Sequence, residues 1–219
     1  MFIAIEGVIG VGKTTLARLL QPRFNANLLL EAFEENPFLA QFYTDRARYA
    51  FQTQVFFLLS RYHQFRQAAQ WLATGQPLIS DYTFEKDKLF ARLNLSGDEW
   101  EVYLRLHDAL AEKMLAPDLI VYLRADTDCL MRRIALRDRP YERHMERDYI
   151  EALNRAYDAQ FLGPRQDPPV LVIESGEMDF VRNEADLETI EAAIRRALRL
   201  PPYQPELPLE SALPALSKD

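Results

Sequence analysis

The chain has 219 residues, 48% of them apolar, and a formal net charge of −7 with an isoelectric point near 5.1. This length and apolar content allow a sizeable core, and we interpret the chain as one large domain. The acidic balance argues against a nucleic-acid-binding protein, which would need a basic face. The single cysteine, Cys129, excludes an internal disulfide and is expected to be buried, and no signal peptide or membrane-length apolar run is evident. We therefore expect a cytoplasmic protein that binds any anionic substrate through local positive charge.

Residues 7–14 read Gly-Val-Ile-Gly-Val-Gly-Lys-Thr and fit the phosphate-binding pattern G-x-x-x-x-G-K-[ST]. An apolar run at 1–5 precedes them and a helical stretch at 15–20 follows, which is the order that the motif requires. Lys13 would reach the β- and γ-phosphates of ATP, and Thr14 would hold Mg²⁺. A plain glycine turn is the alternative, and it leaves Lys13 and Thr14 unexplained. The predicted ATP-binding residues here are Gly7, Val8, Ile9, Gly10, Val11, Gly12, Lys13, Thr14 and Thr15.

Further short apolar runs predict strands at 28–30, 78–81, 119–123 and 170–174. Helical patterns predict helices at 38–73 (with a break near Thr44 and Asp45), 84–92, 96–115, 130–139, 149–161 and 186–200. The alternation predicts an α/β fold of the P-loop kinase type, with a doubly wound five-stranded parallel sheet flanked by helices. Residues 1–200 would form this domain, and the Pro- and Leu-rich stretch 201–219 would be an appended tail.

Two acidic residues, Glu31 and Asp81, follow predicted strands at the sheet edge that carries the phosphate-binding loop. Phosphoryl transfer needs a group that orients and deprotonates the acceptor hydroxyl, and a carboxylate near Mg²⁺. Glu31 and Asp81 fit these two tasks, so Thr14 and Asp81 are the predicted metal-side residues. The alternative is that either carboxylate caps a helix or a turn.

Arginines crowd the segment 132–147 of this otherwise acidic chain: Arg132, Arg133, Arg137, Arg139, Arg143 and Arg147. Arg133 and Arg137 share one helix face, and Arg139 lies at the predicted helix end. Such a cluster suits a lid that neutralises the charge developing on a transferring phosphoryl group. The alternative is a solvated helix face that pairs with Asp138, Glu142 and Glu146, and we prefer this alternative for Arg132 and Arg147. The predicted catalytic residues are therefore Lys13, Glu31, Asp81, Arg133, Arg137 and Arg139.

Many aromatic side chains lie between residues 33 and 90. Most should belong to the core, and some could wall an aromatic base. This set comprises Phe33, Phe38, Phe42, Tyr43, Tyr49, Phe56, Phe57, Tyr82, Phe84 and Phe90.

These features together resemble the deoxynucleoside kinase family, which transfers the γ-phosphate of ATP to the 5′-hydroxyl of a deoxynucleoside. The similarity spans about residues 1–195. It rests on the phosphate-binding loop, on the segment Glu31-Ala-Phe-Glu-Glu-Asn-Pro-Phe-Leu, and on the lid-like Arg-x-x-x-Arg-x-Arg of residues 133–139. The resemblance implies that Glu31 is the base that acts on the 5′-hydroxyl.

The resemblance also implies substrate contacts. Tyr43 and Glu142 would contact the sugar 3′-hydroxyl, and Gln54 would make a paired hydrogen bond with the base. Arg61 and Asp87 would face the base together. The full predicted substrate-binding set is Glu31, Tyr43, Gln54, Arg61, Asp81, Asp87 and Glu142. The loop 176–180 would cover the adenine of ATP, with Asp179 and Phe180 as its contacts.

One segment departs from the family pattern. Many members carry Asp/Glu-Arg-Ser after the third strand, whereas this chain has Asp81-Tyr82-Thr83 and so lacks the arginine that braces the base carboxylate. A tyrosine here is similar to the bacterial deoxyguanosine kinases, as are the segments 36–38 and 75–77. The resemblance therefore implies a purine deoxynucleoside substrate, deoxyguanosine before deoxyadenosine.

Two alternatives remain at this point. A nucleoside monophosphate kinase, such as a thymidylate kinase, shares the fold and a lid but needs additional positive charge to hold the acceptor phosphate. A nucleotide-dependent switch protein would need guanine-reading motifs that are not evident. The aromatic helices between Phe51 and Leu115 carry more apolar surface than one sheet face needs, which favours a homodimer through long helices.

Overall fold

The computed structural model describes residues 1–143, 145–164 and 167–202. Its strands are β1 (Phe2–Glu6), β2 (Asn27–Leu29), β3 (Leu78–Ser80), β4 (Leu119–Arg124) and β5 (Val170–Glu174). They form one five-stranded sheet in the order β2-β3-β1-β4-β5, with every neighbouring pair parallel. The predicted five-stranded parallel sheet is therefore confirmed. The strand order reverses direction at β1, so the loop after β1 lies where such sheets bind ligands.

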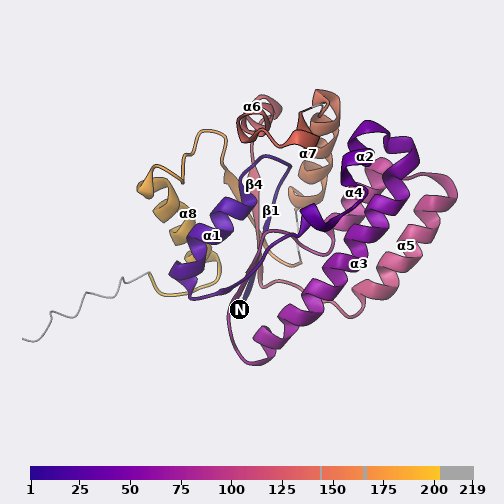
Figure 1. Cartoon of the computed structure of the whole chain (residues 1–219). Helices are drawn as coiled ribbons and strands as arrows, with labels where there is room; N and C mark the ends of the chain where they lie inside the picture. The colour runs from indigo at the N-terminus through magenta and orange to yellow at the C-terminus, as the bar shows by residue number, and fades with distance from the viewer. Residues whose placement is uncertain (144, 165–166, 203–219) are drawn as a thin grey trace, which may run out of the picture.

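Helices cover both faces of the sheet. Figure 1 shows α1 and α8 on one side of it and α3, α4 and α5 on the other, with α6 and α7 beside the carboxyl ends of the strands. The helices are α1 (Lys13–Phe24), α2 (Leu39–Thr44), α3 (Arg46–Ala73), α4 (Lys86–Asn94), α5 (Gly97–Ala111), α6 (Thr127–Arg137), α7 (Arg147–Phe161) and α8 (Glu184–Ala197). Two 3₁₀ turns, η1 (Phe33–Glu35) and η2 (Pro140–Glu142), lie beside the site described below.

The predicted break between the second and third helices is confirmed, and its cause is local. Asp45 has φ −144° and ψ 82°, which is not helical. Its carboxylate accepts a hydrogen bond from the backbone N–H of Arg48 at 3.3 Å, so it caps the N-terminus of α3. The chain therefore turns at Asp45 before the long helix begins.

The carboxyl end of β1 is anchored by a buried acid. Glu6 is completely buried and accepts hydrogen bonds from the backbone N–H of Thr83 at 2.5 Å and from its hydroxyl at 2.7 Å. The hydroxyl of Tyr157 donates to the other carboxylate oxygen at 3.1 Å. Because a buried carboxylate is tolerated only when it is well hydrogen-bonded, Glu6 fixes β1 to the segment after β3 and to α7.

Other parts of the chain need only brief comment. Cys129 is buried as predicted, at the first turn of α6. Of the predicted tail, only Pro201 and Pro202 lie among the described residues. No helix in the described part of the chain is long and apolar enough to span a membrane.

Candidate active site

The phosphate-binding loop between β1 and α1 is packed tightly from two sides. Gly10 and Gly12 have φ values of 88° and 105°, a region that favours glycine. A Cβ on Gly10 would lie 2.7 Å from Ile134 of α6, and a Cβ on Gly12 would lie 3.0 Å from the ring of Phe180. Glycine is therefore required by both the backbone conformation and the space. Phe180, predicted as an adenine contact, is buried against this loop.

Lys13 directs its ammonium into the same loop. Nζ donates to the backbone carbonyls of Gly7 at 2.7 Å and Val8 at 3.2 Å, and the side chain lines a cavity above the sheet. Burial lowers the pKa of Lys13 to about 8, and the neighbouring ammonium of Lys86 adds to the effect. The carboxylates of Glu6, Glu31 and Asp81 oppose this shift without cancelling it.

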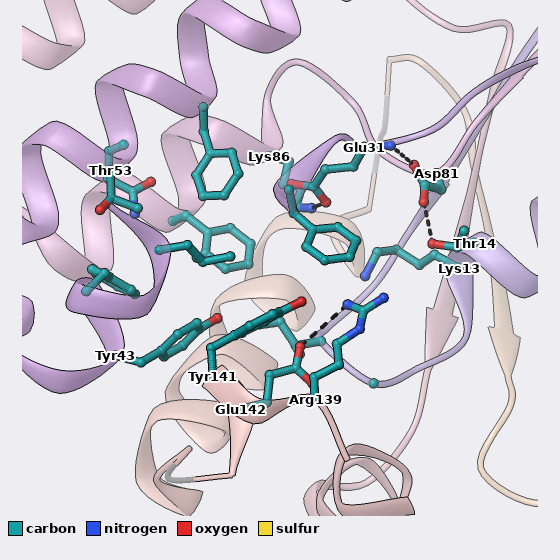
Figure 2. Close-up of a pocket in the computed structure, with 18 of the residues that line it drawn as sticks. Lys13, Thr14, Glu31, Tyr43, Thr53, Asp81, Lys86, Arg139, Tyr141 and Glu142 are labelled. Carbon is teal, nitrogen blue, oxygen red and sulfur yellow. Dashed lines mark hydrogen bonds and ion pairs between the residues drawn. The ribbon is translucent and has the colours of Figure 1, made fainter. Parts of the chain in front are cut away.

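Asp81 connects the phosphate-binding loop to the segment after β2. One carboxylate oxygen accepts a hydrogen bond from the hydroxyl of Thr14, and the other accepts from the backbone N–H of Glu31 at 2.8 Å (Figure 2). The described residues contain no cluster of three or more His, Cys, Asp or Glu that could hold a metal by themselves. The oxygen pair of Thr14 and Asp81 nevertheless suits Mg²⁺, which takes few protein ligands and completes its shell with phosphates and water.

Glu31 is held by two cations. Oε2 lies 2.6 Å from the ammonium of Lys86, and Oε1 pairs with the guanidinium of Arg61. Burial alone would raise the pKa of this carboxyl, but Lys86 and Arg61 outweigh it and hold the pKa of Glu31 well below its usual range. Lys86 and Arg61 therefore favour the anionic form of Glu31.

The sequence analysis did not identify Lys86. It lies in the run Glu85-Lys86-Asp87-Lys88, which has the appearance of a solvated charged turn. The structure buries Lys86 and Asp87 and leaves the side chain of Lys88 42% exposed, paired with Asp108. Only the position of Lys86 shortly after Asp81 could have drawn attention to it.

The rest of the cavity is aromatic and amide-bearing. Tyr43 and the buried Gln54 both line it, together with Arg61. Asp87 is completely buried and pairs with Arg61, but it is not among the lining residues. From the aromatic set, Phe33, Phe42, Tyr43, Phe57 and Phe90 line the cavity.

Tyr82 belongs to the core. Its hydroxyl donates to Gln64 at 2.6 Å, and its ring lies 5.1 Å from that of Phe65. The side chain is completely buried and is not among the lining residues. Tyr82 therefore does not fill the place of the arginine that the family pattern carries here.

The segment from Arg137 to Glu142, which we call the lid, lies across the cavity from Glu31 (Figure 2). Arg137 makes a bidentate ion pair with the buried carboxylate of Glu142, at 2.6 and 2.5 Å, and Arg139 lies 3.7 Å from the same carboxylate. Tyr141, which the sequence analysis did not identify, also lines the cavity. The lid thus brings two guanidinium groups and one phenol ring to the site.

The remaining predicted residues lie elsewhere. Arg133 donates to the carbonyls of Val11 at 3.1 Å and Ser175 at 2.8 Å, so it braces the phosphate-binding loop and does not line the cavity. Asp179 is exposed and accepts from the N–H of Arg182 at 3.2 Å. Arg147 is exposed and pairs with Asp128 at 2.5 Å, in agreement with its interpretation as a surface residue.

Comparison with known proteins gives a consistent result. A family profile described as deoxynucleoside kinase matches residues 3–199. Deoxyguanosine kinase of Bacillus subtilis (strain 168) is 36% identical over 201 residues, which cover 90% of this chain and 97% of that protein. Deoxyguanosine kinase of Lactobacillus acidophilus is 31% identical over 203 residues, covering 86% of each chain. A solved structure of deoxyadenosine kinase from M. mycoides with bound dATP is 26% identical, has a TM-score of 0.77, and covers 89% of this chain and 99% of that one. The chain therefore belongs to the deoxynucleoside kinase family of ATP-dependent phosphotransferases.

Proposed function

We propose that this enzyme transfers the γ-phosphoryl group of ATP to the 5′-hydroxyl of a deoxynucleoside and so produces the 5′-monophosphate for nucleotide salvage. One observation carries the proposal: a single cavity joins a phosphate-binding end to an aromatic, amide-bearing end. Lys13 and Thr14 lie at one end and Tyr43 at the other, with Glu31 between them (Figure 2). A nucleoside bound at the aromatic end would present its 5′-hydroxyl to the phosphate end.

The reaction would use this chain's side chains as follows. The 5′-oxygen attacks the γ-phosphorus, the bond from that phosphorus to the bridging oxygen of ADP breaks, and the hydroxyl proton passes to Glu31. Because phosphoryl transfer has a loose transition state, the carboxylate acts mainly by orienting the hydroxyl, which suits an acid of lowered pKa. Lys13, Arg137 and Arg139 neutralise charge on the transferring group. Mg²⁺, held by Thr14 and Asp81 when bound, would reduce the charge on the phosphates of ATP.

A purine base is the preferred acceptor in this proposal, deoxyguanosine before deoxyadenosine. The B. subtilis and L. acidophilus relatives are named as deoxyguanosine kinases. Gln54 carries one amide donor group and one acceptor, and Arg61 lines the cavity with further donors. The M. mycoides kinase has solved structures with dATP and with dCTP, so deoxycytidine is the pyrimidine to compare.

The monophosphate kinase alternative fits the charges less well. Lys86 and Arg61 place two buried cations on the acceptor side of the cavity. Both cations, however, are paired with Glu31, and Arg61 also pairs with Asp87. An acceptor that already carries a phosphate would have to displace these carboxylates, whereas an uncharged nucleoside would not.

A substrate panel tests the proposal. ADP formation should be measured at fixed ATP with the four deoxynucleosides, their ribonucleoside forms, dGMP and dTMP. We expect deoxyguanosine to have the highest kcat/KM, deoxyadenosine to follow, and ribonucleosides to be poorer. Phosphorylation of dTMP or dGMP without phosphorylation of any deoxynucleoside would overturn the proposal in favour of a monophosphate kinase.

We also propose that the enzyme is a homodimer through the layer of α3, α4 and α5. Exposed apolar side chains on this layer support the idea, since Leu59 on α3 is 40% exposed, Leu93 on α4 is 38% exposed and Val102 on α5 is 47% exposed. Light scattering after size-exclusion chromatography should give twice the chain mass of 25.5 kDa. A mass of one chain at micromolar concentration would contradict the proposal.

A further inference from the structure

Lys86, the first residue of α4, is a buried cation whose carboxylate partner is Glu31. Only 6% of the residue is exposed, and Nζ lies 2.6 Å from Oε2 of Glu31 (Figure 2). The ammonium also lies 5.5 Å from the ring centroid of Phe90. A buried ammonium needs a counter-charge and hydrogen bonds to stay charged, and Glu31 supplies both.

The position of Lys86 is fixed by the end of the sheet. The hydroxyl of Thr83 donates to Glu6 at 2.7 Å and accepts from the backbone N–H of Lys86 at 3.3 Å. Glu6 is the last residue of β1, immediately before the phosphate-binding loop. These two hydrogen bonds of Thr83 connect the backbone at the start of α4 to the end of β1. They therefore fix the position of Lys86 relative to the phosphate-binding loop.

The two cations on Glu31 are not equivalent. Arg61 pairs with Oε1 of Glu31 and also with Asp87, so its charge is shared between two carboxylates. Lys86 pairs with the other oxygen, Oε2. Tyr82, the residue after Asp81, lies in the core. The segment after β3 therefore provides positive charge to Glu31 through Lys86.

We propose that Lys86 is the positioning residue of the acceptor site, and that its ammonium holds the carboxylate of Glu31 in one orientation beside the acceptor hydroxyl. This inference rests on the proposed deoxynucleoside kinase function. Lys86 acts through Glu31, from the first turn of α4.

Several other charged groups face Glu31, from every element around it, and they remain when Lys86 is changed. They are Arg61 on α3, Lys13 on α1, Asp81 after β3, and Arg137, Arg139 and Glu142 on the lid. The nearby phenols Tyr43, Tyr82 and Tyr157 have pKa values raised by burial, so they stay neutral between pH 5 and 9. Changing Lys86 therefore removes one cation beside Glu31 and leaves these other groups in place.

The test compares K86M with K88M on the same helix. Lys88 is 42% exposed and pairs with Asp108 at 3.3 Å, so it is a matched control outside the cavity. In K86M, we expect kcat for the preferred deoxynucleoside to fall on the order of tenfold to a hundredfold. The KM for that deoxynucleoside should stay within about threefold of the wild type, because the orientation of Glu31 is used mainly in the transition state. K88M should match the wild type in kcat and KM, and K86R should recover most of the lost kcat.

A double-mutant comparison shows whether Lys86 acts through Glu31. If it does, E31Q/K86M should be no more than about twofold slower than E31Q alone. This double variant also leaves no unpaired buried charge between the two positions, so it should fold even if K86M does not. A further loss in E31Q/K86M equal to that of K86M alone would overturn the inference.

Different results would refute the role of Lys86 and the proposed kinase function. A wild-type enzyme that phosphorylates deoxynucleosides, together with a K86M variant whose kcat equals that of the wild type, would refute the role of Lys86 and leave the kinase function intact. A wild-type protein that phosphorylates no deoxynucleoside would refute the proposed function itself. Thermal unfolding of each variant should be followed by circular dichroism to confirm that all compared proteins are folded.

Discussion

The ring of Tyr141 on the lid stacks on the ring of Tyr43 on α2, with centroids 6.1 Å apart and planes at 15°. Phe33 joins them from η1, with its centroid 6.2 Å from that of Tyr141. The guanidinium of Arg139 lies 4.1 Å from the ring centroid of Phe33. The lid is therefore fastened over the cavity by aromatic contacts in addition to the ion pairs with Glu142.

Loss of this aromatic contact should weaken nucleoside binding. In Y141L, we expect the KM for the deoxynucleoside to rise about two- to tenfold, since an aromatic pair contributes about 0.5–1.5 kcal/mol beyond its area. The KM for ATP should change little, because Lys13 and Thr14 hold the phosphates. Steady-state kinetics with each substrate varied in turn would check this. A raised KM for ATP with an unchanged KM for the nucleoside would contradict the assignment of Tyr141.

Lys13 should make ATP binding pH-dependent. Burial lowers its pKa to about 8, so the ammonium is charged below this pH and loses its proton above it. Because ATP needs the charged form, affinity should fall as the pH rises from 7 to 9, and binding near pH 8 should take up protons. Calorimetry in two buffers of different ionisation enthalpy would measure the uptake. K13M should abolish it and lower turnover on the order of 10² to 10³. An affinity for ATP that is constant from pH 7 to 9 would refute this.

Glu31 and Asp81 should differ in what they control. E31Q removes the carboxylate nearest the acceptor end, so turnover should fall by about 10² or more while nucleoside binding stays within roughly tenfold. D81N should instead raise the Mg²⁺ concentration needed for activity. Glu35, exposed on η1, gives the matched control E35Q. If D81N causes the larger loss of turnover at saturating Mg²⁺ and E31Q is nearly silent, the two roles are interchanged.

The arginines of the lid region should separate into three groups. R137A and R139A should lower kcat on the order of tenfold or more with a small change in Tm, because both side chains line the cavity. Arg143 is 57% exposed and pairs with Asp138, so R143A should leave kcat unchanged. Arg133, bonded to loop carbonyls, should lower both kcat and Tm when changed to alanine. Equal, small effects at all four positions would favour a solvated helix face.

Asp87 does not line the cavity, but it should influence base choice through its ion pair with Arg61. In D87A, Arg61 loses one carboxylate and gains donors for a carbonyl oxygen of the base, so the kcat/KM ratio of thymidine to deoxyguanosine should rise on the order of tenfold. Asp108, exposed at 58% and paired with Lys88, gives the control D108A. A wild-type enzyme that uses thymidine as well as deoxyguanosine would refute this assignment of the pocket.

Local chemistry explains what could be predicted from the sequence. The phosphate-binding loop was predictable because Gly10 and Gly12 adopt positive φ values and Lys13 follows at a fixed spacing. The strands were predictable because each is a short apolar run between helical patterns, as a covered parallel sheet requires. The break at Asp45 was predictable because an acidic cap satisfies the N–H groups of the helix that follows. Each of these features depends on residues within a few positions of one another.

Features that depend on packing between distant elements were decided only by the tertiary structure. Lys86 and Lys88 are two positions apart in one charged run, yet Lys86 is buried on Glu31, whereas the side chain of Lys88 is 42% exposed and pairs with Asp108. Arg133 and Arg137 share a helix face by spacing, yet one braces the phosphate-binding loop and the other faces the cavity. The sequence determined which charges this protein possesses. Which of them are buried together was decided by the angle at which α4 and α6 pack on the rest of the fold, because a buried charge is stable only beside its partner and those partners come from elsewhere in the chain.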